Sequence, residues 1–101
     1  MKYRVVFPSE SIEKKFGKTL SQISPKAQND IMEAIEKLAD NPRPFGQKPF
    51  KQLNPPIECY QFTAQYRIRI GDFRVLYNVD DVKKVVWILA IRKRNEKTYL
   101  N

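Results

Sequence analysis

The fold is decided by the stretch Tyr66-Arg67-Ile68-Arg69-Ile70-Gly71-Asp72-Phe73-Arg74-Val75-Leu76-Tyr77. Two alternating runs, rich in β-branched and aromatic residues, flank a Gly-Asp pair, and this pattern predicts a β-hairpin with a two-residue turn. Because successive side chains of a strand point to opposite faces, the hairpin would place its apolar residues on one face. The other face would carry Arg67, Arg69 and Arg74.

In this register Arg69 lies directly opposite Arg74, and like charges in that position destabilise a sheet by up to about 1 kcal/mol. Solvation of the guanidinium groups, or their neutralisation by Glu58 or Asp72, would explain the arrangement without a ligand. A bound anion would also explain it, because the planar guanidinium group can hold two phosphate oxygens at once. The composition of the whole chain favours the anion.

The chain of 101 residues contains 19 Lys and Arg against 11 Asp and Glu, a net charge of +8. This excess indicates a polyanionic partner, nucleic acid above all, although an acidic protein covering the surface would also fit. The length predicts one domain over residues 1–101. Neither a signal-peptide core nor a membrane-spanning run is present, so we expect a cytoplasmic protein that does not associate with membranes.

The sequence holds no histidine, no glycine-rich phosphate loop and no metal-ligand cluster, so we expect neither a metal nor another cofactor. Cys59 is the single cysteine. We expect it to be a packed or half-exposed residue rather than a nucleophile, because no histidine exists to activate it.

The first half of the chain predicts a strand followed by a helical hairpin. Ser9 or Ser11 can cap a first helix, in which apolar residues recur at helical spacing as far as Ile23. Ser24 and Pro25 form the start pattern of a second helix. The short connection predicts antiparallel helices whose apolar sides lie on one face of a sheet. The expected ranges are residues 3–7 for the strand, 9–23 for the first helix and 24–40 for the second.

Residues 42–56 hold five of the seven prolines and predict an irregular segment. A segment of this length in a small domain is often functional, but a solvated connector would explain it equally well. The sheet would begin with residues 57–62, and residues 63–65 would be either a turn or a bulged continuation. After a turn at residues 80–83, the apolar run 84–91 predicts a strand buried on both faces and a central place in the sheet.

The order of strand, helical hairpin and mainly antiparallel twisted sheet, together with the hairpin residues 66–77, resembles the RelE/ParE superfamily of bacterial toxins. In that pattern a tyrosine precedes alternating basic and aliphatic residues, and a glycine, an acid, an aromatic residue, an arginine, two aliphatic residues and a tyrosine follow. Residues 92–99 look like the basic terminal motif of the same superfamily. The resemblance covers essentially the whole chain and implies a RelE-like α+β fold and a toxin of a type II toxin-antitoxin system.

RelE-type members cut messenger RNA in the ribosomal decoding site, whereas ParE-type members poison DNA gyrase on the same fold. Carried over by motif, the RelE resemblance implies the catalytic residues Arg69, Arg74, Lys93 or Arg94, and Tyr99. Lys93 and Arg94 are alternatives because the spacing before the terminal tyrosine varies. The further basic residues that we expect to contact RNA are Arg43, Lys48, Lys51, Arg67 and Arg92.

Cleavage by the 2′-hydroxyl of the RNA needs that hydroxyl deprotonated, the phosphorane stabilised and the departing 5′-oxygen protonated. We expect Arg69 and Arg74 to hold the scissile phosphate. Tyr99 could stack on a base or orient the 2′-hydroxyl, and Lys93 or Arg94 could donate toward the leaving oxygen.

Arg67 and Arg69 stand where the best-known members carry lysines, and arginine is a poor general base. Three readings stay open: Lys48 or Lys51 supplies acid-base function, positioning and electrostatics carry most of the rate, or the chain is a weak nuclease.

Three functions therefore follow from the sequence, and the first is a ribosome-dependent mRNA endonuclease that inhibits translation. The second is a gyrase-directed toxin, against which the terminal tyrosine argues mildly. The third is a non-catalytic module that binds RNA or an acidic partner. Under all three we expect a cognate antitoxin with an acidic helix or strand that covers the basic surface.

Overall fold

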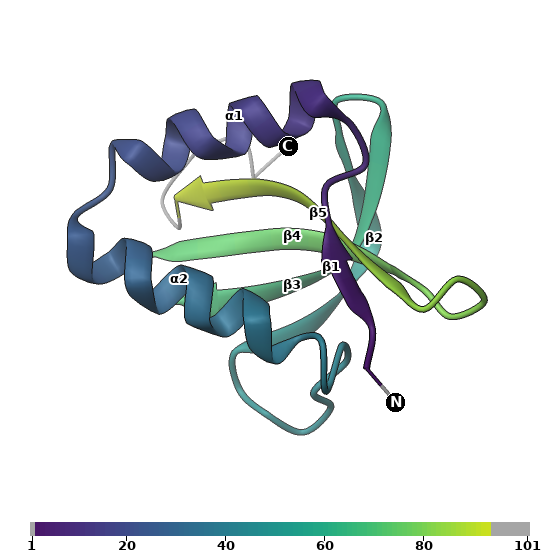
Figure 1. The fold of residues 1–101 in the computed structure, drawn as a ribbon. Helices are drawn as coiled ribbons and strands as arrows, with labels where there is room; N and C mark the ends of the chain where they lie inside the picture. The colour runs from purple at the N-terminus through teal and green to yellow at the C-terminus, as the bar shows by residue number, and fades with distance from the viewer. Residues whose placement is uncertain (1, 94–101) are drawn as a thin grey trace.

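The computed structural model describes residues 2–93 and contains one strand, two helices and four further strands in that order (Figure 1). The elements are β1 (Arg4–Val6), α1 (Glu10–Ser21), α2 (Pro25–Lys37), β2 (Phe50–Cys59), β3 (Phe62–Ile70), β4 (Phe73–Asp80) and β5 (Val85–Lys93). No helix in this described range is long and apolar enough to cross a membrane.

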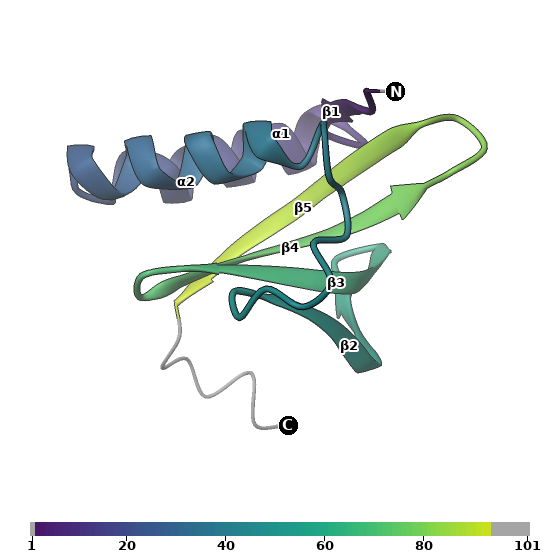
Figure 2. The ribbon, with the colours of Figure 1, turned by 90° about the horizontal axis from the view of Figure 1, so that it is seen from below.

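The five strands form one sheet in the order β1-β5-β4-β3-β2. β1 is parallel to β5, and every other neighbouring pair is antiparallel. Both helices lie on one face of this twisted sheet, as the view along its edge makes clear (Figure 2). The predicted α+β architecture, with a helical hairpin on one face of a mainly antiparallel sheet, is confirmed.

α1 is capped by Ser9, one of the two residues predicted for that position, and α2 begins at the predicted Ser24-Pro25 pair. The Ser9 hydroxyl accepts a hydrogen bond from the Ile12 backbone N–H at 3.2 Å and caps α1. The Ser24 hydroxyl accepts one from the Ala27 N–H at 3.4 Å, with Pro25 as the first residue of α2. These caps satisfy N–H groups that lack a partner within their own helix.

The core has two layers because the sheet is buried on both faces at its centre. The larger cluster lies between sheet and helices and contains Tyr66, Val75 and Tyr77. The smaller cluster lies on the opposite face and includes Cys59, which confirms that this cysteine is packed. β5 contributes to both clusters, as its apolar run predicted, and lies between β1 and the middle strand β4.

The prediction that residues 42–56 are wholly irregular is wrong, because β2 already begins at Phe50. Among the strands of residues 2–93, β2 lies at an edge of the sheet and pairs with β3. Its pairing shifts register between Gln52 and Ile57, and Pro55 and Pro56 fall within that shift. Prolines are tolerated at such places because their missing N–H groups remove no ladder hydrogen bond.

Of the two alternatives predicted for residues 63–65, the continuation is correct, because these residues belong to β3. The predicted strand 57–62 is wrong, because β2 ends at Cys59 and β3 begins at Phe62. β4 continues through Asp80, so its turn to β5 falls at residues 81–84, one residue later than predicted.

Arg43 fastens the segment between α2 and β2 to the helix-covered side of the sheet. Its guanidinium group donates to the Tyr66 hydroxyl at 2.9 Å and to both carboxylate oxygens of Asp81 at 3.1 and 2.8 Å. The Tyr77 hydroxyl donates to the Pro42 carbonyl at 2.7 Å. The Arg43 hydrogen bond, together with one from the Tyr3 hydroxyl, holds the pKa of Asp81 below its ordinary value.

We predict that this pairing makes stability depend on pH. A carboxyl whose pKa is lower in the folded state contributes stability above its unfolded pKa of about 3.9, and that stability is lost as the pH falls through the folded pKa. Asp81→Asn should therefore unfold at lower urea concentration than the parent protein at pH 7, and the difference should shrink toward pH 3.

Asp72→Asn, which removes a carboxylate from the exposed β3–β4 turn, is the matched control and should show no such convergence. Equal urea midpoints of the parent and Asp81→Asn at pH 7, or a difference that persists unchanged at pH 3, would contradict this account of Asp81.

Candidate nucleic-acid interface

The hairpin of β3 and β4 has the predicted register around Gly71, whose φ of 59° suits glycine. The cross-strand pairs are Tyr66 with Tyr77, Arg67 with Leu76, Ile68 with Val75, Arg69 with Arg74, and Ile70 with Phe73. All the predicted apolar residues of the hairpin pack in the core under the helices. The arginines consequently occupy the face of the sheet that the helices leave uncovered.

β5 adds another arginine to this face. Its register places Arg92 opposite Arg74, which itself lies opposite Arg69. Arg69, Arg74 and Arg92 therefore form a row across three neighbouring strands, which we call the arginine row. Residues paired in this way have Cβ atoms roughly 5 Å apart, so the three side chains start as immediate neighbours.

Two further cations flank the arginine row on the side of β2. Lys51 pairs with Arg67, and both lie on the same face as the row. A nitrogen of the Arg67 guanidinium group donates to the Pro49 carbonyl at 2.8 Å, which ties this side chain to the start of β2. We call the set Lys51, Arg67, Arg69, Arg74 and Arg92 the basic face.

The basic face gathers positive charge that cannot be relieved by loss of protons from its arginines, because guanidinium stays protonated at any relevant pH. The four arginines are half-buried, so their attraction for an anion is less screened than that of freely exposed charges. Neither Glu58 nor Asp72, the acids considered as neutralisers, takes part in the ion pairs between described residues. The arrangement suits an anion with several oxygens, such as a phosphate chain.

The other predicted site residues lie elsewhere or outside the described range. Lys93 pairs with Phe73 on the helix-covered face and lines a hollow there with Ile23 and Ile91. Arg43 also belongs to that side, where Asp81 compensates its charge. Lys48 is exposed in the segment that precedes β2. Arg94 and Tyr99 lie outside the described residues.

Tyr60 lies beside Arg92 of the arginine row, Lys15 lies against the Tyr60 ring, and the sequence predicted neither as a site residue. The Tyr60 ring lies in the β2–β3 turn, with the Arg92 guanidinium carbon 5.9 Å and the Lys15 ammonium nitrogen 5.2 Å from its centroid. Tyr60 and Arg92 are far apart in the sequence, so no local sequence pattern predicts their contact.

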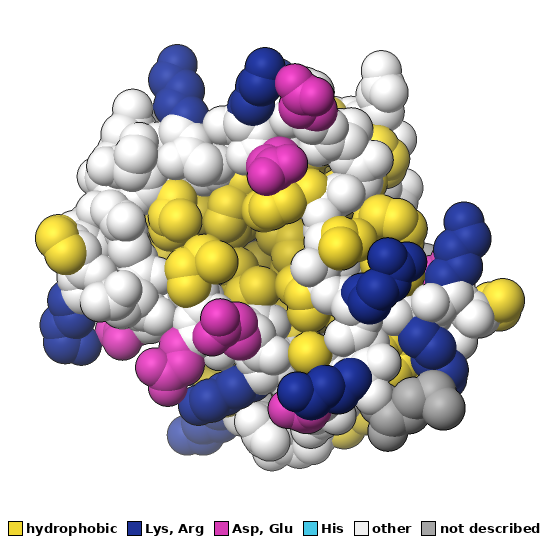
Figure 3. Space-filling model, in the orientation of Figure 1, with side chains coloured by type: hydrophobic (Ala, Val, Ile, Leu, Met, Phe, Trp, Pro, Cys, Tyr) yellow, Lys and Arg dark blue, Asp and Glu magenta, His cyan; other side chains and the backbone are white. Residues whose placement is uncertain are grey.

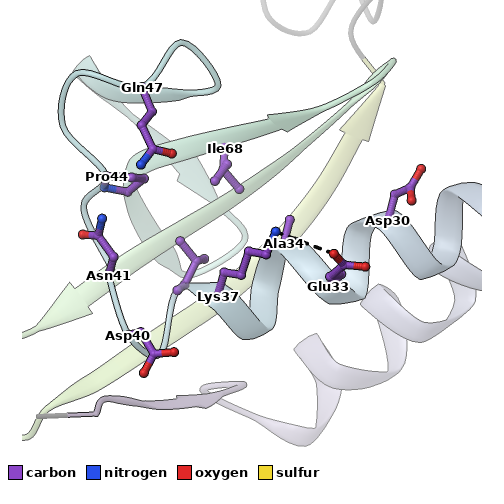
Figure 4. Close-up of a pocket in the computed structure, with 10 residues that line it drawn as sticks. Asp30, Glu33, Ala34, Lys37, Asp40, Asn41, Pro44, Gln47 and Ile68 are labelled. Atoms are coloured by element: carbon purple, nitrogen blue, oxygen red, sulfur yellow. Dashed lines mark ion pairs between the residues drawn. The ribbon is translucent and has the colours of Figure 1, made fainter.

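A hollow on the helix-covered side, between α2 and the segment that follows it, is a poor alternative site for an anion (Figure 4). Asp30, Glu33 and Asp40 line it, and Lys37 is paired with Glu33 at 3.6 Å. Its acidic lining would repel phosphate. Within residues 2–93 no group of three or more His, Cys, Asp or Glu side chains could hold a metal ion.

Comparison with known proteins identifies the family. A family model described as the ParE toxin of type II toxin-antitoxin systems matches residues 6–98. The chain belongs to this toxin family. No curated protein sequence matches the chain significantly.

Solved structures of RelE toxins share the fold of this ParE-family chain. The archaeal RelE–RelB complex from Pyrococcus horikoshii OT3 matches with 26% identity and a TM-score of 0.69, covering 95% of this chain and 99% of the other. The RelBE2 toxin-antitoxin complex from Mycobacterium tuberculosis matches with 22% identity and a TM-score of 0.61, covering 93% and 100%. The intact RelBE complex from E. coli matches with 17% identity and a TM-score of 0.58, covering 93% and 99%. The last two likenesses are of fold alone.

We predict that repulsion between the arginines of the row destabilises the folded protein and that a bound anion relieves this repulsion. Arg69→Gln should leave the free energy of unfolding in chloride unchanged or raise it by up to about 1 kcal/mol, because it removes a pair of opposed like charges. Inorganic phosphate at equal ionic strength should stabilise the parent protein more than the variant, because a ligand that binds the folded state alone stabilises it. Chemical unfolding in the two salts measures both effects.

Lys83→Gln, which removes one exposed charge from the β4–β5 turn, is the matched control and should respond to phosphate as the parent does. A marked loss of stability in Arg69→Gln, or equal stabilisation of all three proteins by phosphate, would show that the row is not an anion site.

Proposed function

We propose that this ParE-family toxin is a metal-independent, ribosome-dependent mRNA endonuclease that inhibits translation in the cytoplasm. The observation that supports the proposal is the arginine row, three guanidinium groups on adjacent strands at the face of the sheet that the two helices do not cover. A row of this kind can hold consecutive phosphates of one RNA strand, or several oxygens of one phosphate.

The proposed reaction uses the RNA's own nucleophile. The 2′-oxygen bonds to the adjacent phosphorus, its proton is lost, and the bond from phosphorus to the 5′-oxygen breaks as that oxygen gains a proton. The products are a 2′,3′-cyclic phosphate and a 5′-hydroxyl. Arg69 and Arg74 would bind the non-bridging oxygens, whose negative charge grows in the pentacoordinate transition state, and preorganised donors of this kind contribute roughly 10²- to 10³-fold each.

Acid-base chemistry is the weaker part of this site, because a guanidinium group does not accept a proton. Lys51, beside Arg67 on the basic face, offers an amine, and Lys48 is a second candidate from the segment before β2. Lys93 pairs with Phe73 on the helix-covered face, away from the basic face, so we keep Arg94 as the candidate for donation to the 5′-oxygen. Tyr99 remains our candidate for stacking on a base or orienting the 2′-hydroxyl.

Dependence on the ribosome is expected because the arginines would stabilise charge but would not by themselves align the reacting atoms of the RNA. Charge stabilisation and positioning lower the barrier only when the 2′-oxygen, phosphorus and 5′-oxygen are in line, and free mRNA is seldom held in that geometry. A decoding site that fixes the backbone of a codon would supply the alignment that the toxin lacks.

We also propose a cognate antitoxin as partner, because the similar structures include toxins solved with their antitoxins. The basic face suits an acidic segment. Apolar side chains are visible between the two helices and provide a second surface for an antitoxin to cover (Figure 3).

The decisive variant is Arg74→Ala. Tightly regulated expression of the parent toxin should arrest growth and create new mRNA 5′ ends within translated codons, and Arg74→Ala should lower the cutting rate by about 10²-fold or more. Lys83→Ala should cut as the parent does, and circular dichroism should show all three proteins folded. Absence of new 5′ ends with the parent toxin, or full cutting by Arg74→Ala, would overturn the proposal.

A gyrase-directed toxin is the second candidate, favoured by the ParE description of the matching family. In that case expression should induce the DNA-damage response and gyrase-linked DNA breaks while mRNA stays intact. Mapping of DNA breaks and mRNA ends from the same cultures separates the two functions.

A further inference from the structure

We propose that the ring of Tyr60 is a stacking platform for a nucleobase of single-stranded RNA held on the basic face. The inference rests on the proposed function in one respect, namely that RNA is the ligand. It assigns a role to a residue in the β2–β3 turn that lies outside the arginine row and the terminal motif.

The first observation is the position of the Tyr60 ring relative to the row. Arg92 lies opposite Arg74 in the sheet, and its guanidinium carbon is 5.9 Å from the centre of the Tyr60 ring. The Tyr60 ring therefore adjoins the β5 end of the row. An RNA strand whose phosphates follow the row would bring a neighbouring base within reach of this ring.

The second observation is the backbone conformation of Tyr60. Tyr60 and Gln61 form the two-residue turn between the paired residues Cys59 and Phe62, and Tyr60 has a φ of 61°. Glycine or asparagine is favoured in this left-handed region, and an aromatic side chain is strained there. Strained residues of this kind concentrate at ligand sites, where the side chain serves a purpose other than folding.

The third observation is that the fold makes little use of the Tyr60 side chain. It is 53% exposed, whereas its neighbour Cys59 is fully buried in the smaller core cluster. The turn is thus anchored by Cys59, and the tyrosine ring faces solvent. Burial raises the pKa of the Cys59 thiol, and the nearby Arg92 opposes that shift, in agreement with the turn lying against β5.

The cations around the ring suit a base and its phosphate. The Lys15 ammonium group from α1 lies 5.2 Å from the ring centre on an exposed side chain. Stacking of a base on an aromatic ring is stronger than an exposed cation–π contact, so an arriving base can displace this ammonium group toward a phosphate. Arg92 would continue to support the ring from the sheet.

The test measures binding of a fluorescein-labelled 2′-O-methyl RNA hexamer, which cannot be cleaved, by fluorescence anisotropy at low salt. Tyr60→Phe keeps the ring and should bind within about twofold of the parent. Tyr60→Gly removes the ring and should weaken binding by roughly 5- to 150-fold, the range for loss of one base–aromatic stack. Because glycine accepts the φ of residue 60, the variant should melt at the same temperature as the parent or higher.

Lys84→Gly is the matched control, because Lys84 has a φ of 57° in the β4–β5 turn, away from the basic face. Lys84→Gly relieves the strain of the same backbone conformation, and this variant should retain RNA affinity within about threefold of the parent. Tyr60→Asn serves as a second variant, since asparagine also tolerates this conformation. A hexamer with abasic sites in place of bases should bind the parent and Tyr60→Gly equally, because it has nothing to stack.

The outcomes separate this inference from the proposed function. Strong RNA binding by the parent that Arg74→Ala abolishes but Tyr60→Gly and Tyr60→Asn leave unchanged would overturn the stacking platform alone. Failure of the parent to bind the RNA would overturn the stacking platform, whereas the proposed function fails only if the parent toxin creates no new mRNA 5′ ends. Equal weakening by Lys84→Gly and Tyr60→Gly would show that the loss comes from turn geometry and would also overturn the platform.

Discussion

The register between β3 and β4 is the constraint on which the rest of the structure depends. Tyr66, Val75 and Tyr77 must point toward the helices, because together with the side chains of α1 and α2 they form the larger core cluster. A slip of one residue would turn every one of these side chains to the opposite face. Burial of the core therefore puts Arg69 and Arg74 together on the opposite face, and the register shift between Leu76 and Tyr77 in the pairing of β4 with β5 brings Arg92 opposite Arg74 on that face.

The arginines on the two faces of the sheet consequently have different surroundings. On the helix-covered side, Arg43 is matched by Asp81 and Tyr66, and its charge fastens a segment of the chain. On the other side, the arginine row assembles like charges on adjacent strands. A structural role explains Arg43, whereas for the row we propose a polyanion as the ligand.

The sequence alone predicted the helix starts, the Gly71–Asp72 turn and the face shared by Arg67, Arg69 and Arg74, because each depends on local pattern. It misjudged the start of β2, since whether a strand tolerates Pro55 and Pro56 depends on its place at the sheet edge. The ion pair of Arg43 with Asp81 and the contact of Tyr60 with Arg92 join distant residues and leave no local signal. The side on which Lys93 lies depends on an irregularity between Leu76 and Tyr77 in the pairing of β4 with β5, which alternation alone does not reveal.

The central claim is that the arginine row receives one RNA backbone, and the most direct measurement is side-chain NMR of arginine during titration with a short 2′-O-methyl RNA. The account predicts that the guanidinium signals of Arg69, Arg74 and Arg92 shift together with a single affinity, while the signal of Arg43, held by Asp81, stays in place. Shifts confined to Arg43 or to arginines outside the row, or no shifts at RNA concentrations that saturate binding, would contradict it.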